Sequence, residues 1–439
     1  MLELLNEFII LAVDGLLATP PGMVVLVSLL VWMIYTVRIK RKQKEYEAAV
    51  ETMVLEVKVE ELNERSPLAM EQIFAALHAI HQNFTWGEKF IGRVVLTFSC
   101  ELVSIGGQVS YIFRIPTRYR NLLESAIFAQ FPKAEIFQVE DYLKNIEKIY
   151  HPEKVEYDFW GTQWLKKKDN AYPIRTYEGF QHPEQKTFID PLSNVIEALS
   201  NLEPHELMAY QLVLKPVDDE WKEGVKKLLD KLKGAPKEKG HNFFDNTFMA
   251  FLGVIIDAIY KAFFEQGAEE KKRPPAPKDE PPSQMLHKTE GEKQIIAAIE
   301  HTLSKIGYAV KVRTLYLGPK DKLNKATRIP EIVGALRNFD DVNLNGIKPD
   351  VKGTWTEPAF KISEKLEQRL TEFRKLGRKR KFLFNFIGRS NWRGTGYTIM
   401  NTEELATIYH FPQAPNVRVS QLEVVQTVKS APPQDLPIG

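Results

Sequence analysis

The sequence predicts an α+β protein in which one N-terminal transmembrane helix precedes two or three folded α+β units. Three observations lead to this prediction. An uncharged, mostly apolar stretch near the N-terminus stops at a dense group of cations, a pattern of alternating strands and helices follows, and part of that pattern recurs later. The chain has 439 residues, which is too long for one ordinary domain. Its 44% hydrophobic and 26% charged residues are typical of a globular protein.

The transmembrane prediction concerns residues 15–37, which carry no charge and are long enough as a helix to cross a hydrocarbon core of about 30 Å. The cations that follow are Arg38, Lys40, Arg41, Lys42 and Lys44. Because excess Lys and Arg mark the cytoplasmic side, we expect residues 1–14 outside the inner membrane and the bulk of the chain in the cytoplasm. Residues 38–52 are then a basic juxtamembrane helix. A cleaved signal peptide is the alternative, but its cations precede the apolar region.

The first folded unit is expected at residues 53–150, where hydrophobic spacing changes from one element to the next. Ser66-Pro67 is expected to supply the N-cap and first-turn proline of a helix, and Gly106-Gly107 is a hairpin signal. The predicted elements are a strand at 53–59, a helix at 68–80, strands at 93–105 and 108–115, a helix at 119–131 and a strand at 134–139. This order is the split βαβ, or ferredoxin-like, arrangement.

The helical pattern of residues 70–80 recurs at residues 192–202, with apolar side chains at matching positions. Both copies begin after a capping residue and a proline and lead into a strand, the second at residues 207–214. A fainter third copy at residues 295–299 precedes a predicted strand at 308–316. We interpret the repetition as a duplication that gives tandem ferredoxin-like domains. A chance match between amphipathic helices is the alternative.

The second α+β domain is predicted in two parts, residues 151–232 and residues 291–411. Between them, residues 233–290 are rich in Pro, Gly and charge, a composition expected of a mobile linker. Within this linker, residues 243–264 form an apolar, Phe-rich segment. It could lie in the membrane interface as an amphipathic helix or dock on a domain or partner. Residues 412–439 are Pro-rich and are expected to be a C-terminal connector.

The sequence contains no recognisable catalytic motif, so we expect no enzymatic activity, cofactor or metal. Residues 394–396 are Gly-rich but lack the spacing and lysine of a P-loop, and are expected to be a turn before a strand at 397–400. His78 and His81 could offer two metal ligands on one helical turn, but a zinc site needs three or four. The single cysteine, Cys100, excludes an internal disulfide and is expected to be buried.

A second group of cations offers an alternative function. Its members are Arg374, Lys375, Arg378, Lys379, Arg380 and Lys381. A strand predicted at 382–387 would place Phe382, Phe384 and Phe386 on one face, where aromatic rings could stack on bases. The segment lacks the RNA-recognition signature, however, and alternate Phe residues on a strand usually face the core.

Five segments carry a family resemblance: residues 103–109, 119–132, 140–142, 169–177 and 401–412. The amino-acid sequences of these segments resemble the membrane-anchored N-terminal region of coupling-type ATPases of type IV secretion and conjugation, including forms from candidate-phylum bacteria. The resemblance extends over nearly the whole chain. In that family a similar Pro-rich segment leads into a RecA-like motor domain with the P-loop. The family's catalytic positions lie in that motor domain and have no counterpart in these 439 residues, so no catalytic residue is carried over.

These observations predict a non-catalytic, membrane-anchored component of a type IV secretion or conjugation-like system. It would position a separately encoded P-loop ATPase, or the substrate of that ATPase, at the cytoplasmic face. The alternatives are a DNA-handling adaptor that uses the basic group of residues 374–381, and the truncated or split N-terminal part of a conjugative ATPase. Expected partners are membrane lipids, the ATPase in trans, DNA in the adaptor alternative, and further copies of the chain in a ring, by analogy with related motors.

Overall fold

The computed structural model describes residues 20–60, 63–149, 156–182, 187–188, 190–233, 288–357 and 364–413. Within these residues the chain divides into two compact units. The smaller unit contains residues 20–49 and 83–94, and the larger one contains the remaining strands and helices. The predicted extracytoplasmic segment 1–14 and the apolar segment 243–264 lie outside the described residues, as do nearly all of the predicted linker and of the C-terminal connector.

The smaller unit is built on helix α2, Pro20–Ala49, which is 30 residues long. The helix continues without interruption from the uncharged stretch into the basic residues, which confirms that the segment predicted as a helix at residues 38–52 is helical as far as Ala49. Residues 15–19, where the predicted membrane span begins, lie outside the described residues. Among the helices that are described, none has the length and apolar character needed to span a membrane.

The second element of this unit is the short helix α4, Trp86–Phe90. Thr85 and Glu88 form a capping box, in which each side chain accepts a hydrogen bond from the backbone N–H of the other residue. The chain then turns at Gly92, which has a φ of +93°. The strand predicted to begin at residue 93 begins only at Phe98, because residues up to Arg93 complete this turn.

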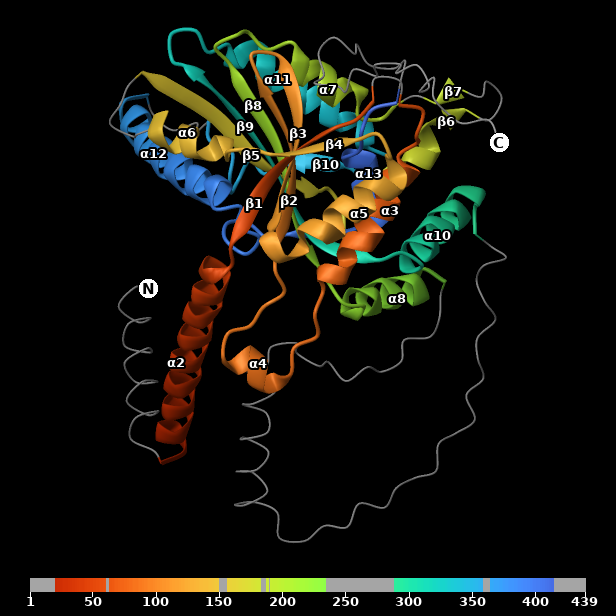
Figure 1. Cartoon of the computed structure of the whole chain (residues 1–439). Coiled ribbons are helices and arrows are strands. Elements are labelled where there is room, and N and C mark those ends of the chain that lie inside the picture. The colour runs from red at the N-terminus through yellow and green to blue at the C-terminus, as the bar shows by residue number, and fades with distance from the viewer. Residues whose placement is uncertain are drawn as a thin grey trace, which may run out of the picture. The chain divides into compact units, whose positions relative to one another are not determined.

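The larger unit contains an antiparallel sheet of nine strands, which confirms the α+β class (Figure 1). The strand order is β10-β5-β9-β8-β2-β3-β1-β4, and β11 pairs with β9. The strands are β1 (Thr52–Lys58), β2 (Phe98–Ile105), β3 (Gln108–Pro116), β4 (Glu135–Gln138), β5 (Tyr157–Lys166), β8 (Leu207–Pro216), β9 (Gly307–Pro319), β10 (Ile347–Pro349) and β11 (Thr398–Asn401). The short strands β6 (Gln181–His182) and β7 (Thr187–Phe188) form a separate hairpin.

The sheet consists of two halves with the same strand order. In the first half, β1, β2, β3 and β4 lie in the spatial order 4-1-3-2, and in the second half β5, β8, β9 and β10 do the same. The crossover helices are α3 (Leu68–Leu77), α5 (Arg120–Gln130), α7 (Ser193–Ser200) and α11 (Lys325–Leu336). The halves meet where β2 pairs with β8, so the two predicted domains share one sheet.

The internal repeat corresponds to equivalent positions in the two halves. Residues 70–80 lie in α3 and the 3₁₀ turn His78–Ile80, and residues 192–202 include α7. Each is the first helix of its half. The fainter third copy lies in α10, Glu290–Leu303, and leads into β9, which is the third strand of the second half. It therefore does not open a third unit.

The two halves differ in how their second and third strands are joined. In the first half a tight turn at Gly106 and Gly107, with φ of +60° and +90°, joins β2 to β3, as predicted. In the second half, α8 (Glu220–Lys233) and α10 stand between β8 and β9. The insertion explains why the sequence repeat fades after the first helix and strand of each copy.

The predicted N-cap of the first crossover helix is wrong in detail. Pro67 occupies the capping position with helical dihedral angles, and no side chain caps the helix. Ser66 contributes its backbone carbonyl, which accepts a hydrogen bond from the N–H of Ala69. The proline still acts as expected, because it lacks the N–H that would remain unpaired at a helix start.

The strand predicted at residues 382–387 is also wrong, because these residues end the long helix α12, Glu364–Ile387. Phe382 and Phe386 are buried one helical turn apart with ring centroids 5.8 Å from each other, whereas Phe384 is 61% exposed. Three alternate phenylalanines fit a strand, but the first and third fit a helix equally well. The basic residues before them are good helix formers and extend the helix through this segment.

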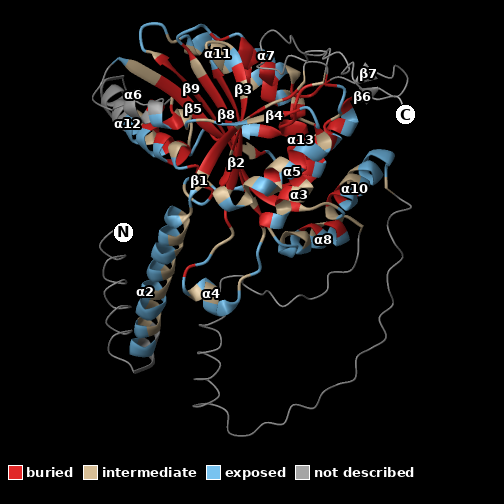
Figure 2. Ribbon diagram, in the orientation of Figure 1, coloured by how far each residue is buried: buried red, intermediate tan, exposed pale blue. Residues whose placement is uncertain are grey.

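Helices cover both faces of the large sheet, so its strands are buried almost throughout (Figure 2). On one face, α6 (Tyr142–Ile149) and α12 pack on residues such as Val103 of β2. On the other, Phe74 of α3 contacts Tyr308 of β9, whose ring lies 6.1 Å from that of Phe98. Val103 and Phe98 point to opposite faces because they are five residues apart on one strand. Cys100 is fully buried, as predicted.

Candidate functional site

The five predicted membrane-proximal cations are all exposed and lie on the second half of α2. Arg41 and Lys42 pair with Glu45 at 3.1 and 2.8 Å, and the guanidinium of Arg38 lies 4.6 Å from the centre of the Phe90 ring. Exposed pairs of this kind contribute little to stability. The five cations therefore lie at the surface of α2, where positive charge attracts an anionic surface.

The first half of α2 exposes apolar side chains around much of its circumference. Those more than a third exposed are Met23, Val24, Val27, Leu30, Val31, Trp32, Met33, Ile34 and Val37. A helix that is apolar on most sides is normally buried in a protein core or in a membrane. An exposed apolar surface of this size indicates a contact with lipid or with another protein.

Part of the second predicted basic group, on α12, is engaged in ion pairs within the protein. Lys379 is buried and forms an ion pair with Asp158 of β5, which Lys325 also contacts at 2.6 Å. Burial alone would raise the pKa of Asp158, but hydrogen bonds from Lys325 and Lys379 outweigh it and lower that pKa to about 2. Lys375 pairs with Glu357 at 2.5 Å. Both lysines therefore fasten α12 to neighbouring elements.

The remaining cations of this group differ in their surroundings. Arg378 donates hydrogen bonds to three backbone carbonyls within residues 351–355. Arg374, Arg380 and Lys381 are exposed. The structure thus does not bring all six predicted nucleic-acid contacts to one free surface.

A buried row of polar side chains crosses the centre of the sheet on the face that α12 covers. Gln163, Arg313, Gln211 and Glu101 lie directly opposite one another on β5, β9, β8 and β2. All four are at most 1% exposed. We call this row the polar ladder. It is unexpected, because a buried polar group lowers stability unless it finds a partner.

The partners of the polar ladder come from residues 385–396, the end of α12 and the loop that follows. Arg313 donates to the carbonyl of Asn385 at 3.0 Å and to that of Ser390 at 2.5 Å. Gln211 donates to the carbonyl of Phe386, and Gln163 donates to that of Gly396 at 2.7 Å. The loop is therefore fastened to three strands by side-chain hydrogen bonds.

Arg389 in this loop closes the network. Its guanidinium donates to both carboxylate oxygens of Glu101, at 2.5 and 3.3 Å, and to both of Asp141, at 2.6 and 3.0 Å. Arg389 adopts a φ of 44°, which a residue other than glycine seldom adopts. Such a conformation persists only where the surroundings determine it. Here the two carboxylates hold it.

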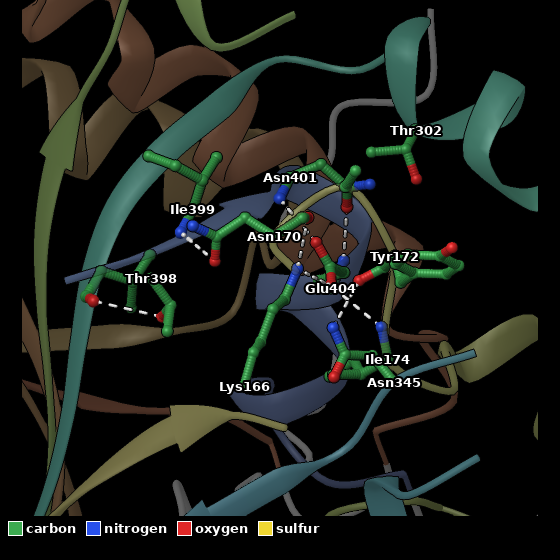
Figure 3. Close-up of polar contacts among 12 residues, drawn as sticks. Lys166, Asn170, Tyr172, Ile174, Thr302, Asn345, Thr398, Ile399, Asn401 and Glu404 are labelled. Carbon is green, nitrogen blue, oxygen red and sulfur yellow. Dashed lines mark hydrogen bonds and ion pairs between the residues drawn. The ribbon is translucent and has the colours of Figure 1, made fainter. Parts of the chain in front are cut away.

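A second buried polar cluster brings together two of the segments that carry the family resemblance (Figure 3). Lys166 and Glu404 form an ion pair of 2.7 Å, and each side chain is 1% exposed. Glu404 also accepts from the backbone N–H of Ile174, and Asn401 caps α13 (Thr402–Ile408) through a capping box with Glu404. Asn170 accepts from the N–H of Ile399 on β11. Residues 169–177 and 401–412 are therefore interdependent.

An open pocket of about 350 Å³ adjoins this cluster and contains three side chains that could bind a metal. Ligand atoms of Glu178, His301 and Glu403 lie within 4.8 Å of one another. His301 already pairs with Glu403 at 2.8 Å, and the ammonium of Lys305 lies 3.6 Å from the same carboxylate. Because these partners satisfy Glu403, we assign no metal to the pocket. Sequence reasoning missed this cluster, since its members are far apart in the chain.

The histidine pair considered from the sequence has a structural explanation. The rings of His78 and His81 stack with centroids 5.6 Å apart, and Nε2 of His78 lies 3.0 Å from the carbonyl oxygen of Val217. Burial lowers the pKa of His78. These contacts join the end of α3 to the end of β8.

No protein-family model matches the sequence, and no curated protein matches it at a significant level. The resemblance to conjugation ATPases therefore stays a prediction.

Proposed function

We propose that this protein is a non-catalytic, membrane-attached module that positions a separately encoded P-loop ATPase, or its substrate, at the cytoplasmic face of the membrane. The proposal rests on the division of α2 into an exposed apolar part and a basic part. Its uncharged residues 20–37 expose large apolar side chains, and exposed cations follow directly behind them. Apolar surface favours the hydrocarbon layer, and cations beside it favour the cytoplasmic headgroups.

In this proposal residues 15–37 form a single transmembrane helix with the N-terminus outside. The first part of that span, residues 15–19, lies outside the described residues. The larger unit then lies on the cytoplasmic side as two ferredoxin-like units joined edge to edge. The identical strand order of the halves and the matching position of the repeated helices support this duplication.

The buried networks support a scaffolding role more than a catalytic one. Arg389 with Glu101, and Lys166 with Glu404, are sequestered from solvent and bind one another. A catalytic group must instead lie within hydrogen-bond reach of a bound substrate. These pairs lock loops to the sheet, which gives a rigid body suited to holding a partner.

The DNA-handling alternative receives less support. Lys375, Arg378 and Lys379 already bind other parts of the protein, so neutralising phosphates would require them to leave those partners. Binding through the exposed Arg380 and Lys381 would still be strongly salt-dependent. Loss of that binding in the R380Q/K381Q variant would favour the adaptor role.

Membrane attachment is tested by sedimenting membranes from cells that express the full chain and washing them at alkaline pH. We expect the protein to stay in the washed membrane pellet and the L30D/I34D variant, with two charges in the apolar surface, to be released. A wild-type protein that stays in the supernatant would overturn the proposal. Hydrolysis of ATP by the purified chain, or a thermal shift with ATP and magnesium, would overturn the non-catalytic role.

A further inference from the structure

We propose that residues 83–94 form a second membrane contact, in which Trp86 and Ile91 enter the interfacial layer of an anionic bilayer beside α2. This inference rests on the proposed attachment of the chain through α2. It adds a lipid-binding surface that the sequence patterns do not indicate.

The segment is fastened to α2 where the uncharged stretch gives way to cations. The ring of Phe90 lies 6.0 Å from that of Tyr35, and the guanidinium of Arg38 lies over it. Gly92 approaches α2 so closely that an added Cβ would lie 2.5 Å from Cβ of Lys42. Positions 35, 38 and 42 are three and four residues apart, so they share one face of the helix. The segment is therefore held at the level of the first cations.

The most exposed apolar side chains of this segment are of the kind favoured at a membrane interface. Trp86 is 75% exposed and stacks on Phe90 with centroids 5.7 Å apart, and Ile91 is 58% exposed. Tryptophan is enriched at the headgroup level because its ring is apolar and its N–H is polar. Two large apolar side chains this exposed on so short a segment indicate a binding surface.

The charge around these side chains favours lipid over a protein partner. Lys89 is exposed on the same segment, and the five cations of α2 are exposed on the same compact unit. Arg93 pairs with Glu88 at 2.5 Å, so the acidic side chain of the segment is neutralised within it. An apolar contact surrounded by cations matches an anionic headgroup layer above hydrocarbon.

The experiment places the full chain in vesicles of phosphatidylcholine and phosphatidylglycerol and measures quenching of tryptophan emission by brominated lipids. The chain has 7 tryptophans, and Trp32 lies in the apolar half of α2, so all variants carry W32F. We expect bromines near the headgroups to quench more strongly than bromines near the chain ends. We also expect the W32F/W86F variant to lose this quenching.

The control is W32F/W392F, which removes a tryptophan that is 50% exposed on the larger unit and should keep the quenching. Equal quenching of W32F and W32F/W86F, with the chain still in the vesicle fraction, would overturn this inference and leave attachment through α2 intact. A chain absent from the vesicle fraction would overturn both. If Trp86 is not quenched and W86S/I91S instead reduces self-association in detergent, the surface binds a second copy of the chain and the lipid proposal is wrong.

Discussion

Replacing Arg389 by methionine tests whether the polar network holds the loop of residues 385–396 on the sheet. The guanidinium makes four hydrogen bonds to Glu101 and Asp141. Glu101 is fully buried and would lose its main partner, whereas the Asp141 side chain is 21% exposed and would be rehydrated. Breaking a buried ion pair typically costs about 3–5 kcal/mol. We expect R389M to lose stability in this range, mostly because of Glu101.

Stability is measured by unfolding in urea, with the fluorescence emission of the buried Trp160 and Trp164 as the signal. The critical comparison is the double variant E101Q/R389M. If the pair acts as a unit, the double variant should be more stable than the sum of the two single variants predicts, by about 1–3 kcal/mol. D141N should cost only about 1–2 kcal/mol, because its site is partly open to water. Additive effects, or an R389M variant within about 1 kcal/mol of the wild type, would refute the reasoning.

Three further predictions concern the same sheet. Burial, together with the nearby Arg313, lowers the pKa of Lys311 to about 7, so the unfolded chain binds a proton that the folded chain lacks between about pH 7 and pH 10. Stability should rise with pH there by up to about 1.4 kcal/mol per unit, and K311M should abolish the rise in urea titrations. The pKa of Asp158 is lowered to about 2, so its charged form contributes about 2 kcal/mol to the free energy of unfolding. This contribution should vanish as pH falls from about 4 to 2, and acid unfolding of D158N should lack that component. G161A should lose about 1–3 kcal/mol, because the new Cβ would overlap the Phe382 ring, whereas G224A, in open space on α8, should gain about 0.5–1 kcal/mol in the same thermal unfolding assay.

The local elements were largely predictable because their signals lie close together in the sequence. Alternation over residues 53–59 gave β1, and the glycine pair at 106–107 gave the hairpin between β2 and β3. The repeated helix pattern predicted two related units. The sequence patterns did not predict the pairing of β2 with β8, because the edge of a strand carries no local sequence signal for its partner.

The polar clusters could not be predicted because their members come from distant segments. Glu101 and Arg389 are separated by 288 positions, and Lys166 and Glu404 by more than two hundred. Each residue alone resembles an ordinary surface charge. The misassigned strand at 382–387 has the opposite cause, since a local pattern was present but fitted two periodicities. The burial of Phe382 and Phe386, with Phe384 between them 61% exposed, fits only the helical period.

The polar ladder gives a physical reason for the fixed register at the junction of the two halves. A slip of one residue between β2 and β8 would turn every side chain of one strand to the other face. If β2 turned over, Glu101 would point to the face where Tyr308 packs on Phe74, away from Arg389 and the other polar partners. An all-apolar junction would penalise the same slip far less. Because Arg389 binds Glu101, the register of the junction and the position of the loop after α12 are determined together. If a partner moves α12, the position of Arg389 and hence the pairing of β2 with β8 should change with it.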